Sequence, residues 1–183
     1  FERVHRLAPI AGQRWILEHV GVFGRDEVQR IRDLGLVLTA LSSRWVEDDG
    51  DKLLDALGEA GAERVLPMRD LIDAGVHVAL ATDNVPPTML APIAHVVRRR
   101  TEKGRLVGPG QAISRVEALA AASREGAYLT FEEDEKGMLA VGKLADFAIL
   151  NEDLLTVPDD RIAGIVADVT VTGGRVVHER TAA

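Results

Sequence analysis

The first part of the chain alternates continuous apolar runs with amphipathic segments. Apolar runs of strand length predict buried strands at residues 14–20, 36–41 and 76–81. Apolar residues at helical spacing, with glycine or proline at several boundaries, predict helices at residues 26–34, 52–60, 67–73, 89–102 and 115–123. Residues 42–51 are predicted to form a polar loop. Strands that alternate with helices at this interval predict parallel strands joined by right-handed crossovers.

The pattern changes after Gly126, where short apolar runs are separated by glycines. These runs lie at residues 145–150, 165–172 and 175–178. Gly173 and Gly174 separate the last two runs and predict a tight hairpin. We therefore expect two parts, residues 1–130 and residues 131–183, of which the second contains a small antiparallel sheet.

Composition and charge narrow the class of protein. Apolar residues make up 46% and charged residues 28% of the 183 positions, which is typical of a folded globular protein. The formal net charge of -7 argues against a nucleic-acid or anionic-membrane surface, because both need clustered cations. The densest basic run, Arg98 to Arg100 with Lys103 and Arg105, follows a helical pattern and is expected to be a solvated face.

Cysteine is absent, so a metal site in this chain would need nitrogen and oxygen ligands. No apolar run approaches the roughly 18 residues of a membrane span, and we expect a cytoplasmic protein. The chain opens on Phe1 without a methionine, inside a predicted helix. This start is what a segment of a larger protein would show.

Two residues with metal-binding side chains follow predicted strands. His19 ends the first strand and Asp83 follows the third, so both are expected at the carboxyl edge of the sheet, where α/β proteins bind ligands. One intervening strand would separate their backbones by roughly 10 Å. Imidazole and carboxylate suit a divalent metal such as zinc, and an aspartate can also accept a proton from water. On spacing alone, the alternative is a pair of ordinary capping or loop residues.

Three segments resemble one known family. The runs RWILEHV (residues 14–20) and LIDAGVHVALATDN (residues 71–84) resemble the sixth and eighth strand segments of the amidohydrolase superfamily. The run EKGMLAVGKLADFAIL (residues 135–150) and the sequence after it are similar to the tail that returns to a small β domain in these enzymes. The branch that the chain resembles most is the exoenzyme-regulatory-like metal-dependent hydrolases.

This resemblance implies a C-terminal part of an enzyme. Residues 1–130 would be the sixth to eighth units of an α/β (β/α)8 TIM-type barrel, and residues 131–183 part of a β-sandwich appendage. His19 would be a metal ligand, and Asp83 both a metal ligand and the proton acceptor. The complete enzyme would use zinc or another divalent metal to hydrolyse a carbon–nitrogen bond in an amide or cyclic amide. The family's other ligands should precede Phe1, so this chain could lack the metal and is expected to be inactive alone.

The remaining candidates have weaker support. Ser42 and Ser43 follow the middle strand and Asn84 follows Asp83, so these three are candidates for lining a substrate pocket. His77 begins the third strand, at the end opposite the expected site, where a packing or hydrogen-bonding role fits better. His95 lies on a helix with charged neighbours and is expected to be solvated.

Two rival functions remain open. One is hydrolytic deamination on the same scaffold, which substrate profiling would distinguish from amide hydrolysis. The other is a non-catalytic structural or assembly module. A small-molecule substrate is the expected partner of the enzyme, whereas nucleic acid and membrane are not. Three parallel strands cannot close a barrel, so we also expect self-association or pairing with the missing N-terminal part of the same protein.

Overall fold

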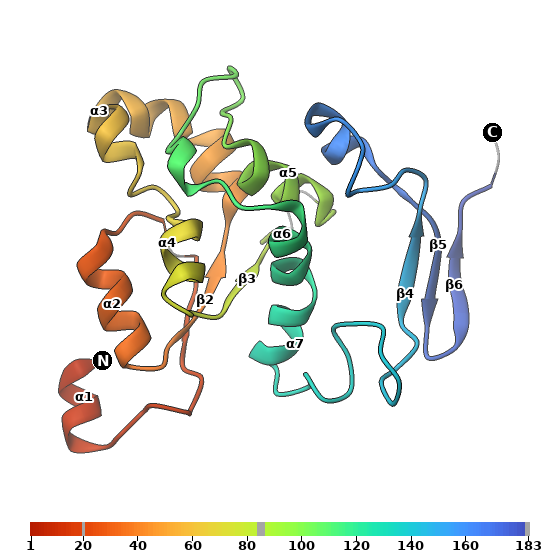
Figure 1. Ribbon diagram of the computed structural model, residues 1–183, viewed down its shortest axis with the longest axis horizontal. Coiled ribbons are helices and arrows are strands. Elements are labelled where there is room, and N and C mark those ends of the chain that lie inside the picture. The colour runs from red at the N-terminus through yellow and green to blue at the C-terminus, as the bar shows by residue number, and fades with distance from the viewer. Residues whose placement is uncertain (20, 84–86, 182–183) are drawn as a thin grey trace.

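A three-stranded sheet with helices around it and a second three-stranded sheet make up the computed structural model, which describes residues 1–19, 21–83 and 87–181 (Figure 1). The elements of the first part are α1 (Glu2–Leu7), β1 (Ile16–Leu17), α2 (Arg25–Asp33), β2 (Val37–Ala40), η1 (Ser43–Asp48), α3 (Gly50–Ala62), α4 (Met68–Asp73), β3 (Val78–Leu80) and α5 (Leu90–Arg98). They are followed by η2 (Pro109–Gln111), α6 (Arg115–Ala122), α7 (Arg124–Leu129), β4 (Phe147–Leu150), η3 (Asp159–Gly164), β5 (Ala167–Thr172) and β6 (Arg175–Glu179). A helix of the length and apolarity needed to cross a membrane does not occur in these ranges.

The first sheet is parallel, with the strand order β1-β2-β3. Leu38 of β2 pairs with Leu17 of β1 on one side and with Val78 of β3 on the other. Helix α2 connects β1 to β2, and η1, α3 and α4 connect β2 to β3. The predicted alternation of parallel strands with helices is therefore confirmed.

Burial differs between the central strand and the edge strand. All four residues of β2 are buried. In β1, Ile16 is 37% exposed and Leu17 is half-buried, so the predicted burial of residues 14–20 is wrong for this strand. In the described part of the chain β1 pairs on one side only. An apolar run indicates a strand, but it does not show how many neighbours that strand has.

The helices around the first sheet bury the residues that the helical pattern selected. Val28, Ile31 and Leu34 of the α2 region belong to the hydrophobic core. Helices α6 and α7 pack against β3. The predicted capping box at the start of α6 is confirmed, because the Ser114 backbone N–H donates to the Glu117 carboxylate (2.8 Å) and the Glu117 backbone N–H donates to Ser114 Oγ (3.2 Å).

The second sheet is antiparallel, with the order β4-β5-β6. Gly173 and Gly174 have φ of +57° and +71° and connect β5 to β6, which confirms the predicted hairpin. In Figure 1 this sheet lies beside the first part, and η3 packs on α5. The division at residue 130 and the assignment of this sheet to a sandwich stay predictions.

The predicted loop at residues 42–51 is a helical segment instead. Ser43–Asp48 forms the π-helix η1, and α3 begins at Gly50. Val46 is fully buried there, and a Cβ on Gly50 would approach Thr101 Cγ2 to 2.8 Å, so the segment packs tightly. The many polar residues of this segment indicated a loop, and a single π-helical turn is too short to produce a periodic sequence pattern.

The basic run at the end of α5 does not form a uniform solvated face. Arg99, in a left-handed conformation with φ of +53°, is 0% exposed. Its guanidinium donates to four backbone carbonyls, those of Val65 (2.6 Å), Leu66 (3.2 Å), Val107 (2.9 Å) and Gly108 (3.2 Å). Burial lowers the pKa of Arg99 to about 10. The fork of donors of an arginine can satisfy several carbonyls at once, which is how this cation is accommodated inside the fold.

Candidate metal site at the carboxyl edge of the parallel sheet

His19 and Asp83 both lie beyond the carboxyl ends of parallel strands. His19 is two residues after the end of β1, and Asp83 is three residues after the end of β3. Strand β2 lies between β1 and β3. The backbone placement predicted from the sequence is thus confirmed, and both residues are exposed at the edge where α/β proteins bind ligands.

Both residues have left-handed backbones, with φ of +55° for His19 and +49° for Asp83. Such values are uncommon for residues with a side chain and occur frequently at functional sites. Each lies in a turn a few residues beyond the end of its strand. Two side chains with metal-binding groups therefore come from turns at the same edge.

Residues of β2 and η1 hold the His19 peptide. The His19 backbone N–H donates to Thr39 Oγ1 (3.1 Å), and Trp45 Nε1 donates to the His19 carbonyl (3.1 Å). The Thr39 hydroxyl donates in turn to the Glu18 carboxylate. The His19 imidazole is 43% exposed, and its Nε2 lies 4.0 Å from Glu18 Oε2, which is too far for a hydrogen bond. The backbone is fixed while the ring is accessible.

The predicted pocket residues occupy different environments. Ser42 is fully buried, and its hydroxyl donates to the Pro92 carbonyl (3.2 Å). Ser43 is also buried, and its Oγ has no hydrogen-bond partner among the described residues. Asn84 lies outside the described residues. A substrate-lining role for these three stays a prediction.

His19 and Asp83 carry groups of the types that bind divalent metals, but two ligands are fewer than a catalytic metal site usually has. Imidazole nitrogen and carboxylate oxygen are ordinary zinc ligands, whereas a catalytic zinc usually has three protein ligands and a water. In residues 1–19, 21–83 and 87–181, no group of three or more His, Asp or Glu side chains is placed to hold a metal. His19 and Asp83 could supply two ligands of a larger set.

Two other histidines serve the fold. His77 Nδ1 lies 2.6 Å from Glu125 Oε2, and its ring stacks on Tyr128 with centroids 3.7 Å apart, as expected for a structural residue. The prediction that His95 is solvated is wrong. His95 lies on α5, and its side chain is buried. Its Nε2 lies 3.0 Å from Glu47 Oε2, and its Nδ1 has no hydrogen-bond partner among the described residues. Burial lowers the pKa of His95, although the nearby Glu47 carboxylate opposes this shift.

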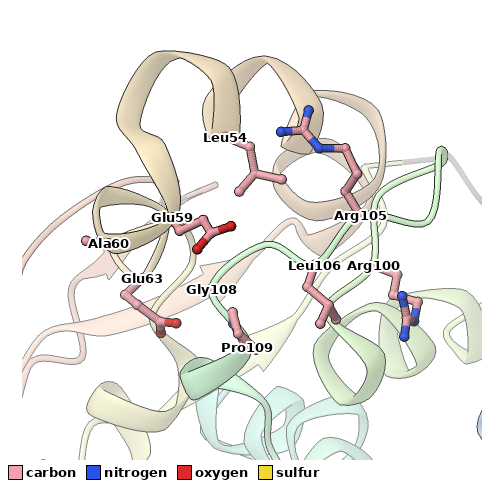
Figure 2. Close-up of a pocket in the computed structure, with 9 residues that line it drawn as sticks. All are labelled: Leu54, Glu59, Ala60, Glu63, Arg100, Arg105, Leu106, Gly108 and Pro109. Atoms are coloured by element: carbon pink, nitrogen blue, oxygen red, sulfur yellow. The ribbon is translucent and has the colours of Figure 1, made fainter.

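A large cleft lies elsewhere, between α3 and residues 100–109 (Figure 2). Its volume is about 690 Å³, and neither His19 nor Asp83 lines it. Several of its polar groups are engaged within the protein: Arg105 donates to Asp55 (2.9 Å), Arg100 to the Gly104 carbonyl (2.7 Å), and Glu63 accepts from the Gly110 N–H (3.1 Å). The cleft therefore does not replace the carboxyl edge as the candidate site.

Thr39 and Trp45 were missed by the sequence reasoning. Thr39 lies within an apolar strand pattern, where a threonine is common for its β propensity alone. Trp45 lies in the segment predicted as a loop. Its one distinguishing signal is its type, since the chain has only two tryptophans.

Comparisons with known proteins identify the family of the chain. A family model described as "Amidohydrolase family" matches residues 1–178. The N-substituted formamide deformylase of Arthrobacter pascens is 28% identical over 172 residues, which are 90% of this chain and 31% of that protein. The imidazolonepropionase of Syntrophobacter fumaroxidans is 30% identical over 163 residues, 78% of this chain and 37% of that protein. The chain thus spans about a third of the length of these relatives.

Solved structures show a similar fold. An uncharacterized metal-dependent hydrolase from Pyrococcus horikoshii superposes with a TM-score of 0.69 at 21% identity, over 86% of this chain and 32% of that one. An atrazine chlorohydrolase mutant from Arthrobacter aurescens, solved in complex with zinc and atraton, has a TM-score of 0.60 at 22% identity, over 90% of this chain and 36% of that one. Given the match of the family model over almost its whole length, the chain belongs to the amidohydrolase family.

Proposed function

We propose that this chain supplies the His19 and Asp83 side of a metal-dependent active site that hydrolyses a carbon–nitrogen bond. The observation that carries the proposal is the placement of both residues after parallel strands, at one edge, with a single strand between them. Family membership and the metal-dependent hydrolases among the structural neighbours support it. The three parallel strands would be the sixth to eighth units of a (β/α)8 barrel, and β4-β5-β6 part of a sandwich.

In this mechanism the two side chains have different tasks. A bound divalent metal supplies Lewis acidity, which polarises a carbonyl and makes water more acidic. His19 would hold the ion through an imidazole nitrogen. Asp83 would hold it through a carboxylate oxygen and accept a proton from the water that attacks the carbonyl carbon. When the carbon–nitrogen bond breaks, the same proton passes from Asp83 to the leaving nitrogen.

The substrate class we infer is an amide. The relative named N-substituted formamide deformylase supports this choice. The exposed position of Asp83 is compatible with proton transfer to and from a bound molecule. Two ligands leave an ion mostly hydrated, so we propose that further ligands come from residues outside this sequence. The chain alone would then bind zinc weakly and hydrolyse nothing.

The test is Asp83→Asn in a protein that contains this chain together with the remaining ligands. The amide is nearly isosteric but cannot accept the proton, so the rate of amide hydrolysis should fall by about 100-fold to 10,000-fold. Asp134→Asn, a change of the same kind in the segment that follows α7, is the matched control and should leave the rate unchanged. Wild-type activity in Asp83→Asn, or amide hydrolysis by the purified 183-residue chain, would contradict the proposal.

A further inference from the structure

The loop that carries His19 is held from a neighbouring strand connection by one aromatic side chain. Trp45 lies on the π-helix η1, directly after β2, and its Nε1 donates to the His19 carbonyl (3.1 Å). From the other side of the same residue, the His19 N–H donates to Thr39 Oγ1 (3.1 Å). Both backbone groups of His19 are therefore bonded to side chains that come from β2 and its continuation.

The indole also packs closely on the chain just after His19. A Cβ added to Gly21 would lie only 2.4 Å from Trp45 Cε2 and 2.5 Å from Cζ2, distances that real Cβ atoms essentially never show. The ring is thus in close contact with the Gly21 backbone, and only a residue without a side chain fits there. This contact is independent of the hydrogen bond to His19.

These two contacts can offset the free-energy cost of the left-handed backbone conformation of His19. His19 has φ of +55°, a left-handed conformation that is uncommon for residues with a side chain and costs free energy unless the surroundings stabilise it. Among the described residues no hydrogen bond holds its imidazole, which is 43% exposed. The direction in which the ring leaves the sheet edge depends on the backbone, and the backbone depends on Thr39 and Trp45.

We propose that Trp45 is a positioning residue for the metal site: its indole N–H and ring hold His19 in the left-handed conformation that presents the imidazole for metal binding. The inference rests on the proposed function in that it gives His19 a metal to bind. A ligand held in advance loses less conformational freedom on binding, so removing its support lowers metal affinity. Loss of such an outer partner typically weakens metal binding about 10-fold to 100-fold.

The chain offers a matched control for this test. Trp45→Phe keeps an aromatic ring and removes the N–H donor. Trp15→Phe makes the same chemical change four residues before His19, where the ring packs edge-on against Phe1 with centroids 5.9 Å apart. Gly21→Ala is a second route to the same effect, because its Cβ has to displace the indole.

The experiment is nuclear magnetic resonance of the 183-residue chain with isotope-labelled histidine. The ring signals of His19 are assigned by their loss in His19→Gln, then recorded without metal and during a zinc titration. We expect Trp45→Phe and Gly21→Ala to move the His19 signals without metal and to raise the half-saturating zinc concentration about 10-fold to 100-fold. Trp15→Phe should change neither by more than about twofold.

The outcomes separate this inference from the proposed function. Unchanged metal-free His19 signals in Trp45→Phe would overturn the positioning role, whatever zinc does. Equal half-saturating zinc concentrations for the His19 signals in the reference chain and in Trp45→Phe would also overturn the positioning role. If zinc instead moves only other histidines in the reference chain, the metal site is refuted, and the metal-free spectra still decide whether Trp45 orients His19.

Discussion

Gly108→Ala should destabilise the fold strongly, because Gly108 packs against the Ala62 carbonyl and the guanidinium of the buried Arg99. Gly108 has φ of +54°, and a Cβ there would lie 2.6 Å from the Ala62 carbonyl oxygen and 3.0 Å from Arg99 Nη2. The left-handed conformation costs an alanine about 1–2 kcal/mol. Forcing extra volume into a packed interior adds about 1–3 kcal/mol. The free energy of unfolding should therefore fall by about 2–5 kcal/mol.

Gly104→Ala is the control that isolates the contact. Gly104 also has a left-handed φ, +81°, but a Cβ there would have nothing within 4 Å. The free energy of unfolding of Gly104→Ala should fall only by the cost of the left-handed conformation for alanine, about 1–2 kcal/mol. Urea unfolding of both variants, followed by circular dichroism at low protein concentration, gives the two free energies. If Gly108→Ala were no more destabilising than Gly104→Ala, the close packing around Arg99 would be wrong.

Two further predictions concern pH. Hydrogen bonds from Arg69 first, then from Ser114, lower the pKa of Glu117 to about 2, so its stabilising contribution is complete above the unfolded value near 4.5 and is lost as pH falls toward 2. Thermal unfolding should show Glu117→Gln less stable than the reference at pH 6 and equal to it near pH 2; a constant difference would count against this pairing. Burial lowers the pKa of His95 below its unfolded value near 6.5, so stability should decline as pH falls below about 6.5. In His95→Gln the urea midpoint should decline less between pH 7 and pH 5, and an equal decline would show that His95 is not responsible.

The strand order and the position of the candidate site followed from the sequence because local patterns determine them. The apolar runs that became β1, β2 and β3 are separated by helices, and that alternation permits little except a parallel sheet. Once the strands are parallel, His19 and Asp83 must lie at one edge. The Gly173-Gly174 pair likewise predicts a hairpin, since glycine adopts the positive φ angles of a tight hairpin turn without the steric cost that a side chain adds.

The features that the sequence did not show depend on contacts between segments that are separate in the sequence. Arg99 has an arginine on each side, and it is the one at the left-handed end of α5 whose side chain is fully buried. His95 is buried because η1 packs on α5, and η1 has no pattern of its own. The proposed role of Trp45 depends on the contact of η1 with Gly21 and His19, which lie 24 and 26 positions earlier in the chain.

The central claim is that His19 and Asp83 bind one metal ion. The most direct measurement is anomalous diffraction at the zinc edge, from crystals grown with zinc of a protein that contains this chain and the remaining ligands. The account predicts a zinc peak with an imidazole nitrogen of His19 at about 2.0–2.1 Å and a carboxylate oxygen of Asp83 at about 2.0–2.2 Å. A zinc peak in the active site with both side chains outside its coordination shell would contradict it.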